Sequence, residues 1–228
     1  MKLLGAVASP YVTRTLMFAR IKGVDLPLED VPTGSPRSPE YRALTPIGKI
    51  PSLMVGDKVL AESEVICEYL EDTHPEPSGF PADPMGRATS RLISRITDLY
   101  IAPHTSTLFR QMNPANRDQT VIDAAAEEFA AAFGYLEHFM GSGPFCVGDT
   151  PSLGDCALAP YMKLLKKVVF PFFDDIPDPT EGEGRLAEWW QAIQSHEICK
   201  ATVDEYGEAV DGFMKGMGAR ITGQQPKE

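Results

Sequence analysis

Ser9 is the first residue of the sequence whose type and position can support chemistry. It precedes Pro10, at the junction between a predicted buried strand over residues 2–8 and a predicted helix over residues 10–22. Serine followed by proline is a typical helix start, because serine caps free N–H groups and proline fits the first helical position. The same hydroxyl can donate a hydrogen bond to a nearby sulfur, and stabilising a thiolate by about 1.36 kcal/mol lowers its pKa by one unit. The sequence therefore allows Ser9 to be a helix cap or a thiol activator.

Lys49, Ile50 and Pro51 lie where the chain enters a predicted strand over residues 50–55. A proline at the start of a strand removes one donor from the hydrogen-bond ladder. This suits a turn whose backbone is presented to a ligand. An ordinary turn into an edge strand explains the same residues, so both interpretations stay open.

Glu62 and Ser63 stand at the start of a further predicted helix. The Ser63 hydroxyl and the free N–H groups of the first helical turn can bind a carboxylate. The Glu62 carboxylate can bind an ammonium group. Together the two residues can hold the end of an α-amino acid, and an ordinary capping pair is the alternative.

Ser152 and Asp155 have the S-x-x-D spacing of a capping box before another predicted helix. In this arrangement the serine caps the helix and the acidic side chain reaches back to the start of the helix. We therefore expect these residues to act in folding and not in catalysis.

The elements that position these residues begin with a compact set of strands and short helices. The first third of the chain predicts the order strand, helix, strand, helix, strand, strand, helix, with a hairpin signal at Gly56-Asp57. This order is typical of a thioredoxin-like α/β fold. The second strand, over residues 26–31, contains Pro27, which suits the edge of a sheet.

Beyond a proline-rich segment the pattern is mostly helical. Prolines recur over residues 75–84 and cannot continue a helix or a sheet, so we expect an interdomain linker there. We predict a thioredoxin-like domain over residues 1–74 and an all-α helical domain over residues 85–228. The expected helices cover residues 85–112 with a bend at Pro103, 117–140, a stretch from about 152, 184–195 and 198–217.

Composition narrows the classes of function. Hydrophobic residues make up 43% of the 228 and charged residues 23%, as in a folded globular protein. The net charge of −11 disfavours nucleic acid and anionic membranes as partners, because phosphates repel the chain. No apolar run approaches the roughly 20 residues that span a bilayer. The short apolar stretch at the N-terminus predicts a strand better than a signal peptide, so we expect a cytoplasmic protein.

Cysteine and histidine spacing gives no sign of a metal site. The four cysteines form no C-x-x-C pair, and the four histidines are scattered. We expect reduced and mostly buried thiols, and neither a metal nor another cofactor. The cysteines are Cys67, Cys146, Cys156 and Cys199.

Five segments, taken in order, resemble the cytosolic glutathione transferase family, in particular its serine-type, bacterial or phi/theta-like members. Each segment alone is weakly specific, but the set covers nearly the whole chain. Redox proteins of the thioredoxin-like fold carry a cysteine at the position of Ser9, so the serine excludes glutaredoxin-type disulfide exchange there. The segments are residues 9–14, 45–53, 62–63, 152–155 and 185–190.

The resemblance implies a role for each candidate in binding glutathione. Ser9 would activate the thiol. The backbone of Ile50 would pair with the cysteinyl unit, ahead of a cis Pro51. Glu62 and Ser63 would hold the γ-glutamyl end.

The glycyl carboxylate would meet a basic side chain at the other end. Lys49 is the first candidate and Arg37 the weaker one, with a solvated surface charge as the alternative for both. Two further hydroxyls, on Tyr11 and Thr13, lie near Ser9 in the sequence, so either can replace it as the thiol activator.

By resemblance, the electrophile pocket lies between the first loop and the long bent helix. Four residues of those segments are candidates, and each has a core or surface role as its alternative. They are Tyr11, Tyr100, His104 and Phe109.

The leading hypothesis is a glutathione transferase. It would conjugate the glutathione thiolate to small hydrophobic electrophiles in detoxification, with peroxides as a second kind of acceptor, and would act as a homodimer with glutathione as co-substrate. The alternative is a non-enzymatic glutathione- or partner-binding protein of the same fold. A glutathione-dependent isomerase or reductive dehalogenase is a weaker hypothesis, because the earliest cysteine, Cys67, is well past the first loop.

Overall fold

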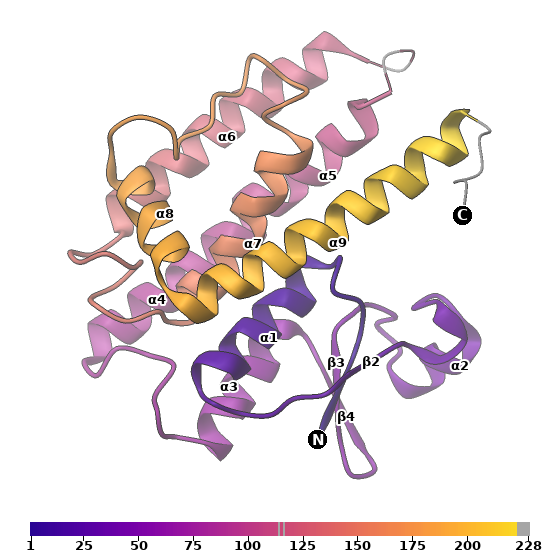
Figure 1. Cartoon of the computed structure of the whole chain (residues 1–228), viewed down its shortest axis with the longest axis vertical. Helices are drawn as coiled ribbons and strands as arrows, with labels where there is room; N and C mark the ends of the chain where they lie inside the picture. The colour runs from indigo at the N-terminus through magenta and orange to yellow at the C-terminus, as the bar shows by residue number, and fades with distance from the viewer. Residues whose placement is uncertain (114, 116, 223–228) are drawn as a thin grey trace.

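The computed structural model describes residues 1–113, residue 115 and residues 117–222. A small sheet with its short helices lies at one end, and long helices form the rest (Figure 1). The predicted class, a thioredoxin-like α/β region followed by an all-α region, is confirmed. The N-terminal elements are β1 (Lys2–Leu4), α1 (Pro10–Ile21), β2 (Leu28–Glu29), α2 (Pro39–Leu44), β3 (Ser52–Val55), β4 (Lys58–Ala61) and α3 (Ser63–Thr73).

The sheet has the strand order β2-β1-β3-β4. β1 pairs parallel with β2 and antiparallel with β3, so Leu3 lies opposite Leu28 on one side and Leu53 on the other. The predicted edge position of the second strand is confirmed. β1 is shorter than the predicted residues 2–8, because the Ser9 N–H donates to the Ala6 carbonyl at 3.0 Å and turns the chain away from the sheet.

The helical region is α4 (Pro84–Ile96), η2 (Thr97–Ile101), α5 (Ala102–Gln111), α6 (Gln119–Phe139), α7 (Leu153–Val168), α8 (Arg185–Ser195) and α9 (Glu197–Thr222). The predicted bend near Pro103 is a wide π-helical turn, in which the Ala102 N–H donates to the Thr97 carbonyl, five residues back. Proline has no N–H and its ring crowds the carbonyl four residues earlier, so the helix widens just before Pro103. Such turns often occur at functional sites.

Helix α1 lies at the centre of the molecule. All eight residues from Val12 to Ala19 are buried, because α1 packs on α3 on one side and on α7 and α9 on the other. Its N-terminus, with Ser9, therefore reaches the junction between the sheet region and the helical region. Residues 74–83 contain no helix or strand, although the predicted domain boundaries at 74/75 and 84/85 stay a prediction.

The helices within the described residues are too short or too polar to cross a membrane.

Candidate functional site

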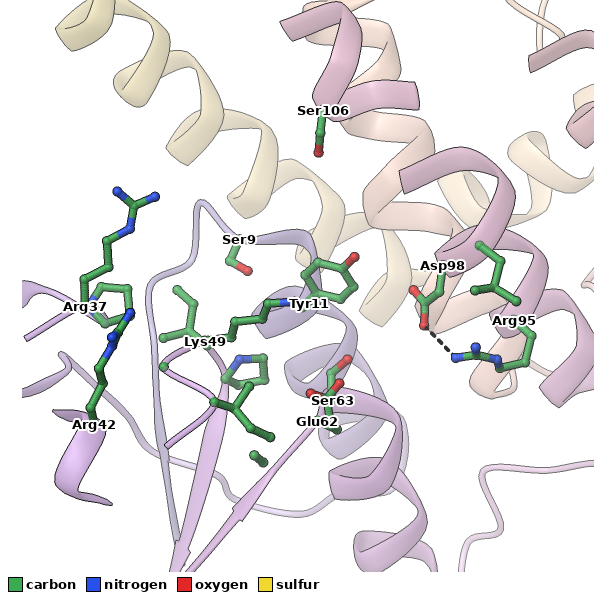
Figure 2. A pocket seen from close by; sticks show the side chains of 17 residues that line it. Ser9, Tyr11, Arg37, Arg42, Lys49, Glu62, Ser63, Arg95, Asp98 and Ser106 are labelled. Atoms are coloured by element: carbon green, nitrogen blue, oxygen red, sulfur yellow. Dashed lines mark ion pairs between the residues drawn. The ribbon is translucent and has the colours of Figure 1, made fainter. Parts of the chain in front are cut away.

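A cleft of about 780 Å³, here called the polar cleft, lies between the sheet region and the run α4–η2–α5 (Figure 2). All seven residues predicted to activate or bind glutathione line it. They are Ser9, Arg37, Lys49, Ile50, Pro51, Glu62 and Ser63. Their roles toward a ligand remain predictions, but the fold does bring them together from four separate segments of the chain.

Ser9 is the N-cap of α1, and its Oγ accepts a hydrogen bond from the Val12 N–H at 3.5 Å. This distance is long for a hydrogen bond, and the bond uses only the acceptor side, so the hydroxyl proton stays available for a ligand. The Thr13 hydroxyl differs, because it is buried and lies 3.1 Å from the carbonyl oxygens of both Val7 and Ser9. Of the two, only Ser9 lines the polar cleft.

Ile50 and Pro51 form a cis peptide bond, as the resemblance implied. The turn before them is fixed by the buried Tyr41, whose hydroxyl donates to the Lys49 carbonyl at 2.8 Å and lies 2.8 Å from Ser52 Oγ. The backbone at residues 49–52 is therefore held rigidly against the floor of the cleft.

Glu62 has a positive backbone φ of 70°, which is rare for a residue with a side chain and is found most often at functional sites. It immediately precedes α3, so the N–H groups of the first turn face the cleft region beside Ser63. The Ser63 Oγ accepts a hydrogen bond from Arg14 Nη1 at 3.2 Å. Because this bond uses the acceptor side of the oxygen, the Ser63 hydroxyl proton points away from Arg14.

Arg14 and Asp98 form an ion pair that the sequence analysis missed. Arg14 is 1% exposed, and its Nη1 lies 3.0 Å from Asp98 Oδ2 in a bidentate pair. Asp98 belongs to the π-helical turn η2, so this pair ties α1 and the start of α3 to the helical region. The charge of Arg14 between the apolar residues Val12 and Leu16 was the available signal, because a buried charge needs a partner.

The polar cleft has two chemically different ends (Figure 2). Arg37 and Arg42 lie at one end. Glu62, Ser63 and Asp98 lie toward the other, where Arg95 Nη1 is 3.9 Å from Asp98 Oδ2. Arg42, Arg95 and Ser106 also line the cleft and were not predicted. Such a cleft suits a ligand with a carboxylate at one end and an α-amino acid at the other.

A second cavity, the apolar pocket, has a volume of about 410 Å³ and adjoins the first. Its walls come from the start of α1 and from α5, α7 and α9. They include Phe109, Tyr161, Leu164, Val168, Val210, Phe213 and Met214. Among the residues that the structure describes, Arg110 is the one charged residue in this lining. Ser9, Tyr11 and Ser106 line both cavities.

The four candidates for the electrophile pocket separate in the structure. Tyr11 and Phe109 line the apolar pocket. Tyr100 and His104 line neither cavity, because their face of the helix turns toward α6. The Tyr100 ring packs edge-on to Tyr135 at 5.5 Å, and His104 Nε2 lies 3.9 Å from Glu128 Oε2.

The four cysteines are free and buried, and none lines either cavity. Burial raises the pKa of the Cys67 thiol to about 12, so this thiol stays protonated and unreactive. Among the residues with described positions, no group of three or more His, Cys, Asp or Glu side chains could hold a metal ion.

Fold and site together define a protein in which a thioredoxin-like region and a helical region share one cleft. The sequence matches the glutathione S-transferase N-terminal domain over residues 3–78 and the glutathione S-transferase C-terminal domain over residues 119–192. A probable glutathione S-transferase BZ2 from Zea mays is 32% identical over 181 residues, which cover 73% of this chain and 75% of the maize protein. The chain therefore belongs to the glutathione S-transferase family, whose members are enzymes.

Two further relatives bear on the site. A maleylacetoacetate isomerase from Rattus norvegicus is 32% identical over 147 residues, which cover 61% of this chain and 66% of the rat protein, just under two thirds of its length. A theta class glutathione S-transferase from Xanthomonas axonopodis pv. citri, solved with glutathione bound, superposes with a TM-score of 0.73 at 25% identity. That likeness covers 89% of this chain and 96% of the other.

Proposed function

We propose that this protein binds glutathione along the polar cleft, activates its thiol with Ser9 and transfers the thiolate to a small hydrophobic electrophile in the apolar pocket. The γ-glutamyl end lies at Glu62 and Ser63, and the glycyl carboxylate lies toward Lys49 and Arg37. The cysteinyl unit pairs with the backbone of Ile50 beside Pro51. Glutathione serves as co-substrate, and no further cofactor is needed for this chemistry.

One observation carries the proposal. Ser9 belongs to the lining of both cavities, so a sulfur beside it faces the polar cleft on one side and the apolar pocket on the other. The Ser9 hydroxyl can donate to a thiolate, and the N-terminus of α1 adds its positive dipole end. Lowering the thiol pKa by one to two units from about 8.5 needs only about 1.4–2.7 kcal/mol, which these two effects can supply.

The apolar pocket supports an uncharged, hydrophobic acceptor. Its lining includes Phe109, Phe213 and Leu164, and no acidic side chain of the described part of the chain, so it favours apolar groups and does not repel a thiolate. Conjugation then depends mainly on positioning the sulfur and the acceptor carbon at contact distance. A peroxide that fits the same pocket is the second kind of acceptor.

The first experiment separates binding from turnover. Calorimetry with glutathione should give a dissociation constant that Ser9→Ala changes little, while Ser9→Ala lowers kcat on a panel of electrophiles by about 100-fold. Because alanine also removes a helix cap worth about 0.5–2 kcal/mol, Ser9→Gly is the matched control, since glycine costs only a few tenths as an N-cap. Both variants should lose the same activity.

The same experiment tests the alternatives. Loss of activity in Tyr11→Phe or Thr13→Val, with Ser9→Gly fully active, would assign activation to another hydroxyl. A protein that binds glutathione but turns over no member of the panel would be a binding protein of the same fold.

A second candidate activity is glutathione-dependent isomerisation, which is favoured by the rat relative named as a maleylacetoacetate isomerase. Arg110, exposed at the edge of the apolar pocket, can meet a carboxylate of such a substrate. Maleylacetoacetate should therefore be included in the panel, and its isomerisation without net consumption of glutathione would favour this activity over conjugation.

We also propose a cytoplasmic homodimer. Val65 of α3 and Leu92 of α4 are exposed apolar side chains outside both cavities and offer contacts for a second copy. The four free cysteines suit a reducing compartment. Light scattering at micromolar concentration should give twice the mass of the chain, and Leu92→Glu should reduce the measured mass to that of one chain.

A further inference from the structure

Tyr41 is a buried residue of α2 that the proposed chemistry leaves without a role. Within α2, all of which the structure describes, Tyr41 alone is buried. Its side chain packs with Leu4 of β1 and with Val31 in a small cluster apart from the main core. Helix α2 is therefore attached to the sheet through this one side chain.

The Tyr41 hydroxyl joins α2 to the turn that leads into β3. It donates to the Lys49 carbonyl at 2.8 Å and lies 2.8 Å from Ser52 Oγ. Because its single proton is used toward Lys49, the Ser52 hydroxyl is the donor to Tyr41. Burial raises the pKa of the Tyr41 hydroxyl, against a smaller opposite effect of Ser52, so the proton is retained. In such a buried chain each hydrogen bond strengthens the next.

The two sides of the cis peptide bond are held by different parts of the structure. Ser52 begins β3 and lies opposite Leu4 of β1 and Ala61 of β4, so the sheet fixes the chain from Pro51 onward. Lys49 lies before the strand, where the Tyr41 hydroxyl holds its carbonyl. The geometry between Lys49 and α2 therefore depends on this hydroxyl.

Arg37 and Arg42, at one end of the polar cleft (Figure 2), stand on either side of Tyr41 in the sequence. Both side chains are exposed, so their positions depend mainly on the backbone that carries them. This backbone lies close to the turn before Lys49, because a Cβ on Gly48 would lie only 3.1 Å from Arg42 Nε. A shift of α2 would therefore move both guanidinium groups away from the cleft.

We propose that Tyr41 is a positioning residue for the carboxylate end of glutathione. Its hydroxyl locks α2 to the Lys49 carbonyl, so that Arg37 and Arg42 face the glycyl carboxylate together with the Lys49 ammonium group. Tyr41 touches no ligand and acts through these basic residues. The inference rests on the proposed function, since it needs glutathione in the polar cleft.

The test compares glutathione with its glycyl ethyl ester, in which the carboxylate at this end is blocked and uncharged. Calorimetry should show that the unmodified protein binds glutathione about tenfold more tightly than the ester. Tyr41→Phe keeps the ring and removes the hydroxyl, so it should raise the dissociation constant of glutathione by about tenfold and that of the ester by less than about twofold. In this variant kcat at saturating glutathione and the pKa of the bound thiol should not change, because Ser9 is not affected.

Ser90→Ala is the matched control for the loss of a buried hydroxyl. Ser90 Oγ also has two partners, Ser152 Oγ at 2.9 Å and the Gly154 N–H at 3.0 Å, and lies outside both cavities. The variant should lower the urea midpoint as Tyr41→Phe does, and leave both dissociation constants unchanged. Ser52→Ala removes only the donor to Tyr41, so it should raise the dissociation constant of glutathione by about threefold without changing that of the ester.

The other outcomes separate this proposal from the proposed function. Equal losses of affinity for glutathione and for the ester, the same loss in Ser90→Ala, or unchanged binding of glutathione by Tyr41→Phe would overturn the positioning role. If the unmodified protein bound the ester as tightly as glutathione, the positioning role would fail and thiol activation at Ser9 would stand. Binding of neither ligand would overturn both proposals.

Discussion

The backbone of Glu62, a residue of the polar cleft, is held in an unfavourable conformation. Its φ of 70° and ψ of 113° lie outside the regions that a side chain normally permits. The Ile66 N–H donates to the Glu62 carbonyl at 2.9 Å, so the start of α3 enforces this backbone. Strain of this kind costs about 1–3 kcal/mol and is tolerated where a ligand needs the geometry.

Replacing Glu62 by glycine should separate stability from binding. Glycine accepts a positive φ without strain, while its greater freedom in the unfolded chain costs about 0.5–1 kcal/mol. We therefore expect Glu62→Gly to unfold in urea at the same or a higher midpoint, while its affinity for glutathione falls by about tenfold or more. Glu62→Gln is the control for charge: it should weaken binding without any gain in stability. A lower urea midpoint for Glu62→Gly would show that the conformation is not strained.

The candidate site residues themselves could be predicted from sequence, but the contacts that orient them could not. Ser9, Ile50 and Ser63 stand at element ends, which local signals reveal. Arg42 and Asp98 reach the same cleft only through the tertiary fold, and no spacing rule links residues that lie so far apart in the chain.

At the scale of elements, Asp155 joins three segments around the start of α7. It is fully buried, and its Oδ2 accepts from the Ser152 N–H at 2.8 Å and from the Ser152 hydroxyl at 3.0 Å. Its Oδ1 accepts from the Cys146 N–H at 2.8 Å and from the Trp189 indole N–H at 2.9 Å. The capping-box spacing predicted the contact with Ser152, whereas the links to Cys146 and Trp189 depend on how the helices pack.

Asp155→Ala should therefore destabilise the protein more than Ser152→Ala. Loss of the Ser152 cap costs about 0.5–2 kcal/mol, whereas removing Asp155 leaves several buried donors unpaired at about 1–3 kcal/mol each. Chemical denaturation should give this order, and Asp155→Asn, which keeps one acceptor oxygen, should fall between the two. Glutathione affinity, measured below the melting temperature, should change little in all three variants. A melting curve of Ser152→Ala identical to that of the unmodified protein would refute its capping role.

A buried ion pair between Lys22 and Glu71 holds the C-terminal ends of α1 and α3 to residues 77–79. The Lys22 ammonium lies 2.6 Å from Glu71 Oε2 and 2.7 Å from the Pro77 carbonyl. Ser78 and the Gly79 N–H also donate to Glu71, at 2.7 and 2.9 Å. Burial alone acts to raise the pKa of the Glu71 carboxyl, but these hydrogen bonds and the Lys22 charge hold it below its ordinary value.

The lowered pKa of Glu71 predicts the direction of the pH dependence. Its contribution to stability is complete above the pKa of an unfolded glutamate, about 4.3, and is lost as the pH falls through the lower folded value. At pH 7, Glu71→Gln should cost about 3 kcal/mol, because it leaves the Lys22 charge without its partner. This difference from the unmodified protein should shrink as urea unfolding is repeated from pH 5 down to pH 3. Glu29→Gln, which breaks the exposed pair with Lys2, should show no such pH dependence, and a constant penalty for Glu71→Gln would contradict the prediction.

For the whole molecule, the structure shows how closely the thioredoxin-like and helical regions depend on each other. The sequence indicated two units joined by a proline-rich linker, because periodicity reports each helix separately. It could not indicate that α1 packs against α7 and α9 as well as against its own region. Arg20 at the end of α1 donates to Thr202 at 3.0 Å and pairs with Glu205 at 2.7 Å, both in α9. Helix α1 therefore forms part of the packed core of both regions.

A fragment of residues 1–78 should not fold by itself. All residues from Val12 to Ala19 are buried, the apolar and the polar ones alike, so α1 needs cover on every side. Exposing only two large apolar side chains costs about 3–6 kcal/mol, which is comparable with the whole stability of a small domain, about 5–15 kcal/mol. We expect the fragment to bind a hydrophobic dye and to show no cooperative transition in urea, whereas the full chain should unfold in one transition.

The fragment should also fail to bind glutathione, since Arg95, Asp98 and Ser106 of the polar cleft belong to the missing part. A sharp unfolding transition in the isolated fragment would show that the α1 face is stable without α7 and α9, and that the two regions are independent domains.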